Sequence, residues 1–182
     1  MAEGRLLNFP YFLFNKQNQY FYRECVPKPA LGDVVDVAIK AGNFKILVKL
    51  LSELQLVDAL RNAKAQTIFA PSDEAFAELQ EDWRFGNFQN KTYEQKMAIV
   101  LRHVVPGATL LGADLTRGRI KTAGGEYIHL YPSSLQWGKF CVQYKISYCI
   151  IVDPADVKAS NGVIHVTDEV IWSKQPQFGG SG

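Results

Sequence analysis

Apolar side chains recur at intervals of three and four residues through the first half of the chain, a spacing that predicts amphipathic helices. Asp33 is a suitable N-cap for the first helix, and Gly42 is a suitable stop. Thr92 and Gln95 have the spacing of a capping box, and Pro106 follows the last expected helical residue. Helices are therefore expected over residues 33–41, 44–54, 56–61 and 92–105, with Met97, Val100, Leu101 and Val104 as the buried stripe of the last one.

The segment TIFAPSDEAFAEL, residues 67–79, contains a strand signal followed directly by a helix signal. Three apolar residues in a row are typical of a buried strand, and Pro71 ends that run. Ser72 can cap a helix, and Asp73 and Glu74 suit its first turn because carboxylates are favoured near free amides and the positive end of the helix dipole. This placement accounts for the acidic pair without catalysis.

Beyond residue 107 the pattern changes to alternation. Tyr127, His129 and Tyr131 alternate with Ile128 and Leu130, which is the spacing of a strand. Helices followed by strands, without an internal repeat, predict a single α+β domain. Further strands are expected over 140–143, 148–152 and 163–166.

Composition divides the chain into an aromatic-rich N-terminal arm over 1–31, a main domain over 32–174 and a tail over 175–182 that ends in the linker-like GGSG. The arm either packs over the main domain as an extended segment or exposes an adhesive surface for a partner or an apolar ligand. Its aromatic residues, which follow no helical or strand period, are Phe9, Tyr11, Phe12, Phe14, Tyr20, Phe21 and Tyr22.

Composition and charge exclude several classes of protein. A chain of 182 residues with 47% apolar and 21% charged residues is typical of about one globular domain. The net charge is only +2 and the cations are not clustered, which argues against a nucleic-acid-binding protein. No apolar run approaches the ~20 residues of a membrane span, and the first residues do not form a signal peptide.

The candidate catalytic residues are three histidines that lie far apart in the sequence and lack the spacing of a metal site. No phosphate-binding loop, nucleophile elbow or zinc-protease motif is present. His103 lies near a helix end and His165 inside the segment GVIHV, where hydrogen-bonded structural roles fit better than catalysis. The sequence therefore predicts no enzyme, no metal and no cofactor.

Four segments resemble boxes of the fasciclin domain family, whose members include fasciclin, periostin and related matrix proteins. TIFAPSDEAFAEL resembles the first signature box, and ASNGVIHVTDEVI resembles the closing box. ILVKLLSELQLVDAL resembles the helical segment before the first box, and VLRHVVPGATL resembles the middle tyrosine–histidine box. The resemblance covers nearly the whole main domain, from Gly32 to Trp172.

This resemblance implies a wedge of β-strands with a helical layer, and adhesion rather than catalysis. In the family the first box builds a strand and the start of a packed helix, and the closing box returns a strand beside it. Asn161 and Gly162 would form the turn before that strand, since Asn-Gly is favoured where positive φ is needed. The residues expected to serve the structure are Thr67, Phe69, Pro71, Phe76, Asn161, Gly162 and His165.

Two segments are candidates for partner binding. In the middle box Arg102 precedes His103 where the family normally has tyrosine, so the integrin contact proposed for that tyrosine transfers poorly to this pair. VDPADVKASNG resembles the acidic Glu-Pro-Asp integrin motif, with Asp153, Pro154 and Asp156 near the motif positions and one residue inserted. Alternatively, the Asp-Pro pair only starts a turn.

Cysteine usage and a glycosylation sequon point to the compartment. Cys141 and Cys149 are placed symmetrically about a hairpin turn at 144–146, which would put them opposite each other within disulfide reach. Cys25 is left over for pairing with another chain or with a missing segment. Asn90 begins the sequon NKT, next to a helix cap. Together with the family resemblance, these features favour an extracellular or cell-surface location.

Two functions remain open. The first is an adhesion or matrix-interaction domain that binds a cell-surface receptor, a matrix protein or a glycan. The second is a carrier of an apolar small molecule such as a pigment or lipid, which a few members of the family resemble. The face formed by Tyr127, His129 and Tyr131, together with the aromatic arm, would line the groove of such a carrier.

Overall fold

The computed structural model describes residues 13–14, 20–21, 30–82, 86–134, 137–143 and 149–172. The chain divides into two compact units, Met1–Ala30 and Leu31–Gly182. The described part of the first unit is an antiparallel pair of two-residue strands, β1 (Leu13–Phe14) and β2 (Tyr20–Phe21). Most of the aromatic arm and the tail over 175–182 lie outside the described residues.

The helices of the second unit begin and end where local capping chemistry favours it. The Asp33 carboxylate caps α1 by accepting from two backbone amides, and Gly42 ends this helix with a φ of 79°. The Ser72 hydroxyl caps α4, and Thr92 with Gln95 forms the expected capping box at α5. The helices are α1 (Val34–Ala41), α2 (Lys45–Glu53), α3 (Val57–Asn62), α4 (Asp73–Glu81) and α5 (Tyr93–Arg102), with short 3₁₀ turns η1 (Phe88–Asn90) and η2 (Gly112–Asp114).

A sheet with the strand order β4-β3-β9-β8-β7-β6-β5 runs through the second unit. β3 and β9 are parallel neighbours, with Thr67 opposite Val163, and the other neighbouring pairs are antiparallel. The first and closing signature boxes therefore lie side by side, as expected. The strands are β3 (Gln66–Pro71), β4 (Val104–Pro106), β5 (Gly118–Lys121), β6 (Tyr127–Pro132), β7 (Phe140–Gln143), β8 (Ile150–Ala159) and β9 (Gly162–Thr167).

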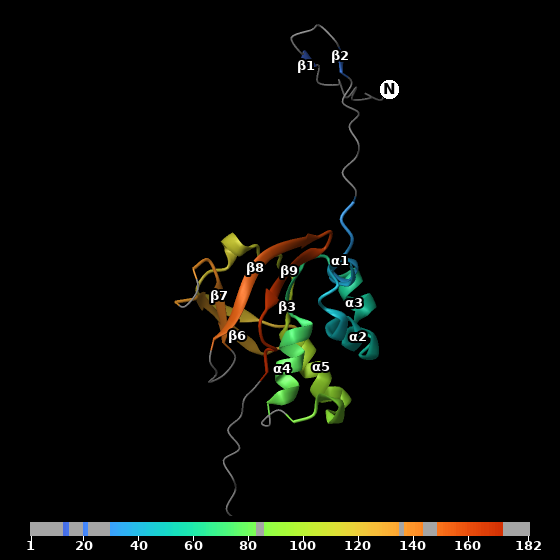
Figure 1. The fold of residues 1–182 in the computed structure, drawn as a ribbon, viewed down its shortest axis with the longest axis vertical. Coiled ribbons are helices and arrows are strands. Elements are labelled where there is room, and N and C mark those ends of the chain that lie inside the picture. The colour runs from blue at the N-terminus through green and yellow to red at the C-terminus, as the bar shows by residue number, and fades with distance from the viewer. Residues whose placement is uncertain are drawn as a thin grey trace, which may run out of the picture. The chain divides into compact units, whose positions relative to one another are not determined.

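β3 and β9 are buried on both faces, which explains why their sequences are continuous rather than alternating apolar runs. Ile68 packs toward the helices together with Phe76, whereas Phe69 belongs to a second core with residues of β6, β7 and β8. Pro71 ends β3 opposite Thr167. Figure 1 shows the helices on one side of β3 and β9 and the strands β6, β7 and β8 on the other. This is the expected α+β fold, a strand wedge with a helical layer.

The last helix is shorter than the sequence predicted. α5 ends at Arg102 with His103 as its C-cap, and Val104 begins β4, which pairs with β3. A buried valine fits a helical stripe and a strand equally well, so the apolar pattern could not place this boundary. β5 was not predicted from the sequence either.

β8 extends well past its predicted end at residue 152, and the interpretation of Asp153-Pro154 as the start of a turn is wrong. The pairing with β9 shifts between Asp153 and Val157, so that residues 154–156 stand opposite the single residue His165. Such an insertion is a β-bulge, a place where a strand tolerates proline.

Gly162 serves a close approach between strands rather than a turn with positive φ. It is the first residue of β9, paired with Ala159, and neither Asn161 nor Gly162 has a positive φ. A Cβ atom at position 162 would lie 2.3 Å from the carbonyl oxygen of Gln66. Only glycine allows β3 and β9 to approach this closely at their first residues.

Candidate functional site

His103 is buried at the end of α5 and ties this helix to the segment after β9. Its Nε2 accepts a hydrogen bond from the Ile171 amide at 2.8 Å, so Nδ1 carries the proton and donates to the Ile99 carbonyl, also at 2.8 Å. Burial is the main cause that lowers the pKa of His103 to about 4, while the bond to the Ile99 carbonyl acts in the opposite direction. With 1% of its surface exposed, His103 supports the core and is not available to a partner.

Arg102, the other partner-binding candidate of the middle box, is also engaged within the domain. Its Nε donates to Oε2 of Glu126 in an ion pair, and its side chain is only 13% exposed. The pair connects the end of α5 to the residue before β6. Because a buried charge is costly unless it is paired, this contact is best explained as structural.

The acidic segment of β8 places its two carboxylates in different surroundings. The Asp153 side chain is 57% exposed, and its Oδ2 lies 3.3 Å from Nζ of Lys139. Asp156 lies at the other end of the bulge with a φ of 45°, which is uncommon for a residue other than glycine. Its Oδ1 accepts a hydrogen bond from the Gly112 amide at 2.6 Å. Pro154 lies between the two in the bulge, and Asp153 is the more accessible carboxylate.

His165 lies opposite this bulge with its ring fully buried. Its Nε2 lies 2.7 Å from the Leu110 carbonyl and must therefore carry the proton, because a carbonyl only accepts. Nδ1 makes no hydrogen bond with the described residues and lies 3.8 Å from Oδ1 of Asp156. Burial is the main cause that lowers the pKa of His165, while the Leu110 carbonyl and Asp156 raise it. The ring packs against Phe69, with centroids 5.9 Å apart.

The side chains of Thr67 and Asn161 form hydrogen bonds that connect neighbouring segments to the central strands. The Thr67 hydroxyl donates to the Ala108 carbonyl at 2.8 Å. The side-chain oxygen of Asn161 accepts from the Val34 amide at 3.0 Å, and its nitrogen donates to the Leu60 carbonyl at 2.8 Å. Asn161 therefore joins the start of α1 to the end of α3, a role in which both ends of its amide group are used.

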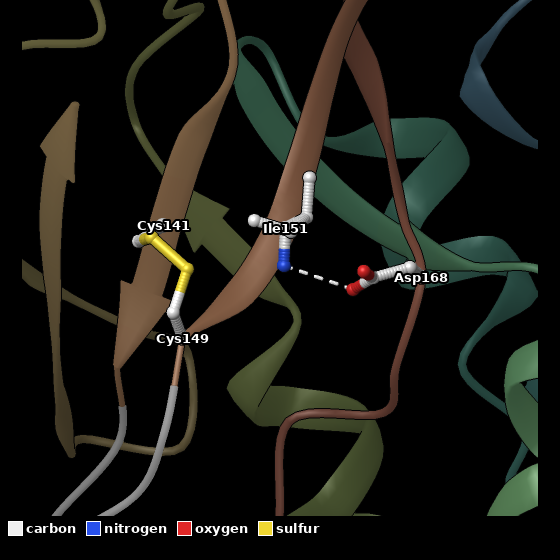
Figure 2. The surroundings of a disulfide bond; sticks show 4 residues. All are labelled: Cys141, Cys149, Ile151 and Asp168. Carbon is white, nitrogen blue, oxygen red and sulfur yellow. Dashed lines mark hydrogen bonds between the residues drawn. A yellow bond between two sulfur atoms is a disulfide. The ribbon is translucent and has the colours of Figure 1, made fainter. Parts of the chain in front are cut away.

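Cys141 and Cys149 form a disulfide, with Cα atoms 5.0 Å apart (Figure 2). The expected symmetric register is wrong, because Cys141 is paired with Ile151 and not with Cys149. The disulfide instead joins β7 to the residue immediately before β8. The expected turn at 144–146 and Cys25 lie outside the described residues.

Asp168 extends the pairing of β8 beyond the end of β9. Figure 2 shows its carboxylate accepting a hydrogen bond from the Ile151 amide, at 2.8 Å. The Asp168 amide in turn donates to the Ile151 carbonyl at 3.2 Å. Burial is the main cause that raises the pKa of Asp168, and the bond from Ile151 lowers it. β8, which begins directly after Cys149, is thus hydrogen-bonded through Ile151 to the segment that follows β9.

The expected ligand face of β6 is a solvent-exposed side of the sheet. Tyr127 and His129 are exposed and Tyr131 is half-buried, whereas the residues between them point into the core. Arg119 of β5 lies opposite His129, and its guanidinium carbon lies 4.1 Å from the centre of the Tyr127 ring. Lys121 lies opposite Tyr127. A face with these cations does not match an apolar ligand.

The glycosylation sequon lies where a modifying enzyme can reach it. Asn90 is exposed at the end of η1, and its side chain is not needed for the cap of α5. The Thr92 hydroxyl accepts from the Gln95 amide at 3.3 Å. The position is compatible with a glycan on Asn90.

Two further features bear on function. Within the described ranges, no three or more His, Cys, Asp or Glu side chains are grouped so that they could hold a metal ion. No helix found among those same residues combines the length and the apolar character needed to cross a membrane.

Residues 42–173 match the family model described as the fasciclin domain. The chain belongs to the fasciclin family. Both signature boxes, the buried histidines and the bulge of β8 lie inside the matched range. Fasciclin domains are in general non-catalytic adhesion domains, and no enzyme family is evident here.

Relatives occur in bacteria and in a mammal. "Protein sll1483" from Synechocystis sp. is 33% identical over 138 residues, which cover 76% of this fasciclin domain chain and 72% of that protein. "Uncharacterized protein sll1735" from the same organism is 31% identical over 143 residues, covering 78% and 98% of the two chains. "Transforming growth factor-beta-induced protein ig-h3" from Sus scrofa is 29% identical over 147 residues, which cover 79% of this chain and 20% of that protein.

The fold is similar to that of a solved structure, a FAS1 domain pair from the insect cell adhesion molecule fasciclin I. The TM-score is 0.66 at 18% sequence identity, and the match covers 80% of this chain and 52% of that chain. At this identity the likeness shows the fold alone.

The main feature of this exposed face that sequence reasoning missed is the pair of cations on β5. Arg119 and Lys121 alternate with a single apolar residue in the segment TRGRIKT. The period of two was present, but a strand with so few apolar residues resembles a loop. Because the strand itself was not predicted, the position of its cations beside the Tyr127 face could not be predicted either.

Proposed function

We propose that this fasciclin domain is an extracellular adhesion or matrix-interaction module that binds a protein or glycan partner through an exposed face. The observation that carries the proposal is the family match over residues 42–173. The geometry supports it, because His103 and His165, the buried histidines that could serve catalysis, are bonded to backbone groups of the core. The groups free to meet a partner lie on the surface.

Two features support the extracellular part of the proposal. The disulfide between Cys141 and Cys149 is of a kind that persists in oxidising compartments and is rare in the cytosol. Asn90 offers an exposed sequon, and such glycosylation takes place on the secretory route. Mass spectrometry of protein from its source should find the disulfide intact.

The test is attachment of cells, or of soluble matrix proteins, to a surface coated with the purified, oxidised domain. Attachment should increase with coating density and should require the folded state. A matched coat of the Phe69→Ala variant, shown to be unfolded by circular dichroism, provides the control, since losing this fully buried side chain costs about 3–5 kcal/mol. Equal attachment to both coats would contradict the proposal.

Asp153 is the residue of the acidic segment that is best placed to contact a protein receptor. Its carboxylate is more exposed than that of Asp156, which is bonded to the Gly112 amide. If a receptor of the integrin type reads this segment, Asp153→Asn should reduce attachment, and Asp58→Asn on an exposed part of α3 should not. Equal attachment to both variants would remove the segment from the proposal.

A second candidate function, transport of an apolar small molecule, has one observation in its favour. A surface cavity of about 290 Å³ between α1 and α2 is lined mainly by apolar groups, including Phe44 and Val48. Ile39, which also lines the cavity, is 55% exposed. This volume lies just below the ~300–1,000 Å³ of small-molecule sites. An organic extract and absorption spectrum of protein from its native source should reveal a bound lipid or pigment, and Val48→Asp should abolish its retention.

A further inference from the structure

Strand β5 and its neighbour β6 present a row of cations beside a row of ring side chains on one exposed face. Arg119 lies directly opposite His129, and Lys121 lies directly opposite Tyr127. Residues directly opposite each other in an antiparallel pair project from the same side of the sheet. Ile128 is buried on the other side. The cations and rings therefore share the solvent face at the β5 end of the described sheet.

The cations on this face have no acidic partner among the residues that the structure describes. Arg119 and Lys121, and the exposed Arg117 one residue before β5, make no ion pair with any described residue. We call these three residues the basic row. Glu126, the residue directly before Tyr127, is already paired with Arg102. The chain has a net charge of only +2 and no long run of cations in its sequence, but the three cations of the basic row lie within the five residues 117–121.

Arg119 is also held in a defined orientation. Its guanidinium carbon lies 4.1 Å from the centre of the Tyr127 ring, within the range of a cation–π contact. Stacking on a ring covers the face of the guanidinium but leaves its N–H edges free to bind an oxyanion with two hydrogen bonds. An arginine restrained in this way loses less conformational entropy on binding than a free one.

We propose that the basic row is a binding site for a linear sulfated polysaccharide. This inference rests on the proposed adhesion function and names its partner class. Alternate residues of a strand are about 7 Å apart, so Arg119 and Lys121 offer cations at a regular spacing to a chain that carries repeated anionic groups. Basic clusters of this kind are typical of heparin-type sites. The Tyr127 hydroxyl and the His129 ring add hydrogen-bonding groups beside the cations.

Other occupants fit less well. An apolar ligand would have to desolvate three cations, which is costly. A nucleic acid would be expected to meet basic residues over a much larger surface than this chain provides. An acidic peptide added to the β5 edge is the remaining alternative, but edge strands commonly carry exposed Lys and Arg that discourage such pairing.

The test uses soluble heparin as the probe and the oxidised, folded protein. The triple variant Arg117→Gln, Arg119→Gln, Lys121→Gln should bind heparin about tenfold more weakly at physiological salt, since exposed charge contacts each contribute modestly. Wild-type binding should weaken with rising salt, as surface electrostatics is screened. The matched control is Lys40→Gln, Lys45→Gln, Lys64→Gln, which removes the same charge from exposed positions elsewhere and should bind as the wild type does.

Three additional measurements keep the result interpretable. Arg119→Gln alone serves as a second variant if the triple variant self-associates in size-exclusion chromatography. Desulfated heparin should bind much more weakly than heparin. Polyglutamate tests the peptide alternative, and binding of polyglutamate as tight as that of heparin would overturn the proposal. Equal losses in the triple variant and its lysine control would overturn it as well, because the binding would then follow net charge and not the basic row.

The outcome also separates this inference from the adhesion proposal. If the domain supports attachment but does not bind heparin, the polysaccharide site is wrong and adhesion stands. If it binds heparin through the basic row but supports no attachment, the site stands and adhesion is wrong. If it does neither, both are wrong.

Discussion

Replacing Gly162 by alanine should destabilise the domain strongly, because the added methyl group has no space. Its Cβ would lie 2.3 Å from the carbonyl oxygen of Gln66 and 2.9 Å from Cγ of the same residue. Real Cβ contacts are essentially never shorter than 3.0 Å, so β3 and β9 would have to separate at their first residues. Shortening the Gln66 side chain would not relieve the clash, since the nearest atom belongs to the backbone.

The expected cost follows from the rigidity of this neighbourhood. Forcing an extra methyl group into a packed core typically costs ~1–3 kcal/mol. The upper end applies at Gly162, because the obstacle is a carbonyl group at the junction of two strands that are buried on both faces. A loss of about 3 kcal/mol is a large share of the ~5–15 kcal/mol that stabilises a typical domain.

Urea denaturation at neutral pH, with the oxidised protein, measures this loss as a change in the free energy of unfolding. Gly118→Ala in β5 is the matched control, since the nearest atom to a Cβ there is the Thr116 carbonyl oxygen at 3.9 Å and φ is not positive. This variant should be neutral or more stable by up to ~1 kcal/mol, because alanine restricts the unfolded chain. If the two alanine variants unfold at the same urea concentration, the close approach at Gly162 does not constrain the fold and the reasoning is refuted.

Four further outcomes are expected. The fold lowers the pKa of His103 from 6.5 to about 4. As the pH falls, the unfolded chain therefore takes up a proton at this residue before the folded protein does. The contribution of His103 to the free energy of unfolding is thus complete above pH 6.5 and is lost toward pH 4. At about 1.4 kcal/mol per pKa unit the loss approaches roughly 3 kcal/mol, and His103→Gln should flatten the pH dependence seen by chemical denaturation. Asn161→Ala should cost about 1–3 kcal/mol in the same assay, since it removes the partner of the buried Val34 amide, whereas the Leu60 carbonyl keeps its hydrogen bond from the Gln66 side chain. The paired change Cys141→Ser, Cys149→Ser should cost about 2–3 kcal/mol, as expected for a loop of eight residues. Thiol labelling of the native protein should find Cys25 as the one reactive cysteine, and three labelled cysteines would contradict the disulfide.

The parts of the fold that the sequence predicts well are those with a local cause. Asp33, Ser72 and Thr92 satisfy free amides within the next three residues, so the starts of α1, α4 and α5 can be read without knowledge of any distant partner. The side-by-side placement of β3 and β9 came from the resemblance of their boxes to those of a known family. The periodicity of either strand alone would not have paired them.

The parts that sequence could not predict depend on partners far along the chain. Val104 is a strand residue because it pairs with β3, and the bulge over 154–156 is defined by its position opposite His165 of β9. The candidate site behaves in the same way. His103 and Arg102 look similar in sequence to surface residues, but the fold engages both with partners in other segments.

The position of β9 has a consequence for how the chain reaches its native state. β9 lies between β3 and β8 in the sheet, although it follows both of them in the chain. Thr67 of β3 is therefore synthesised 96 residues before Val163, its partner in β9 (163 − 67 = 96). At ~5–20 residues per second, ribosomal synthesis leaves one edge of β3 open for about 5–20 s. During that interval the open edge can pair with other nascent chains, so the yield of soluble protein should depend on synthesis rate and chaperone supply more than on final stability.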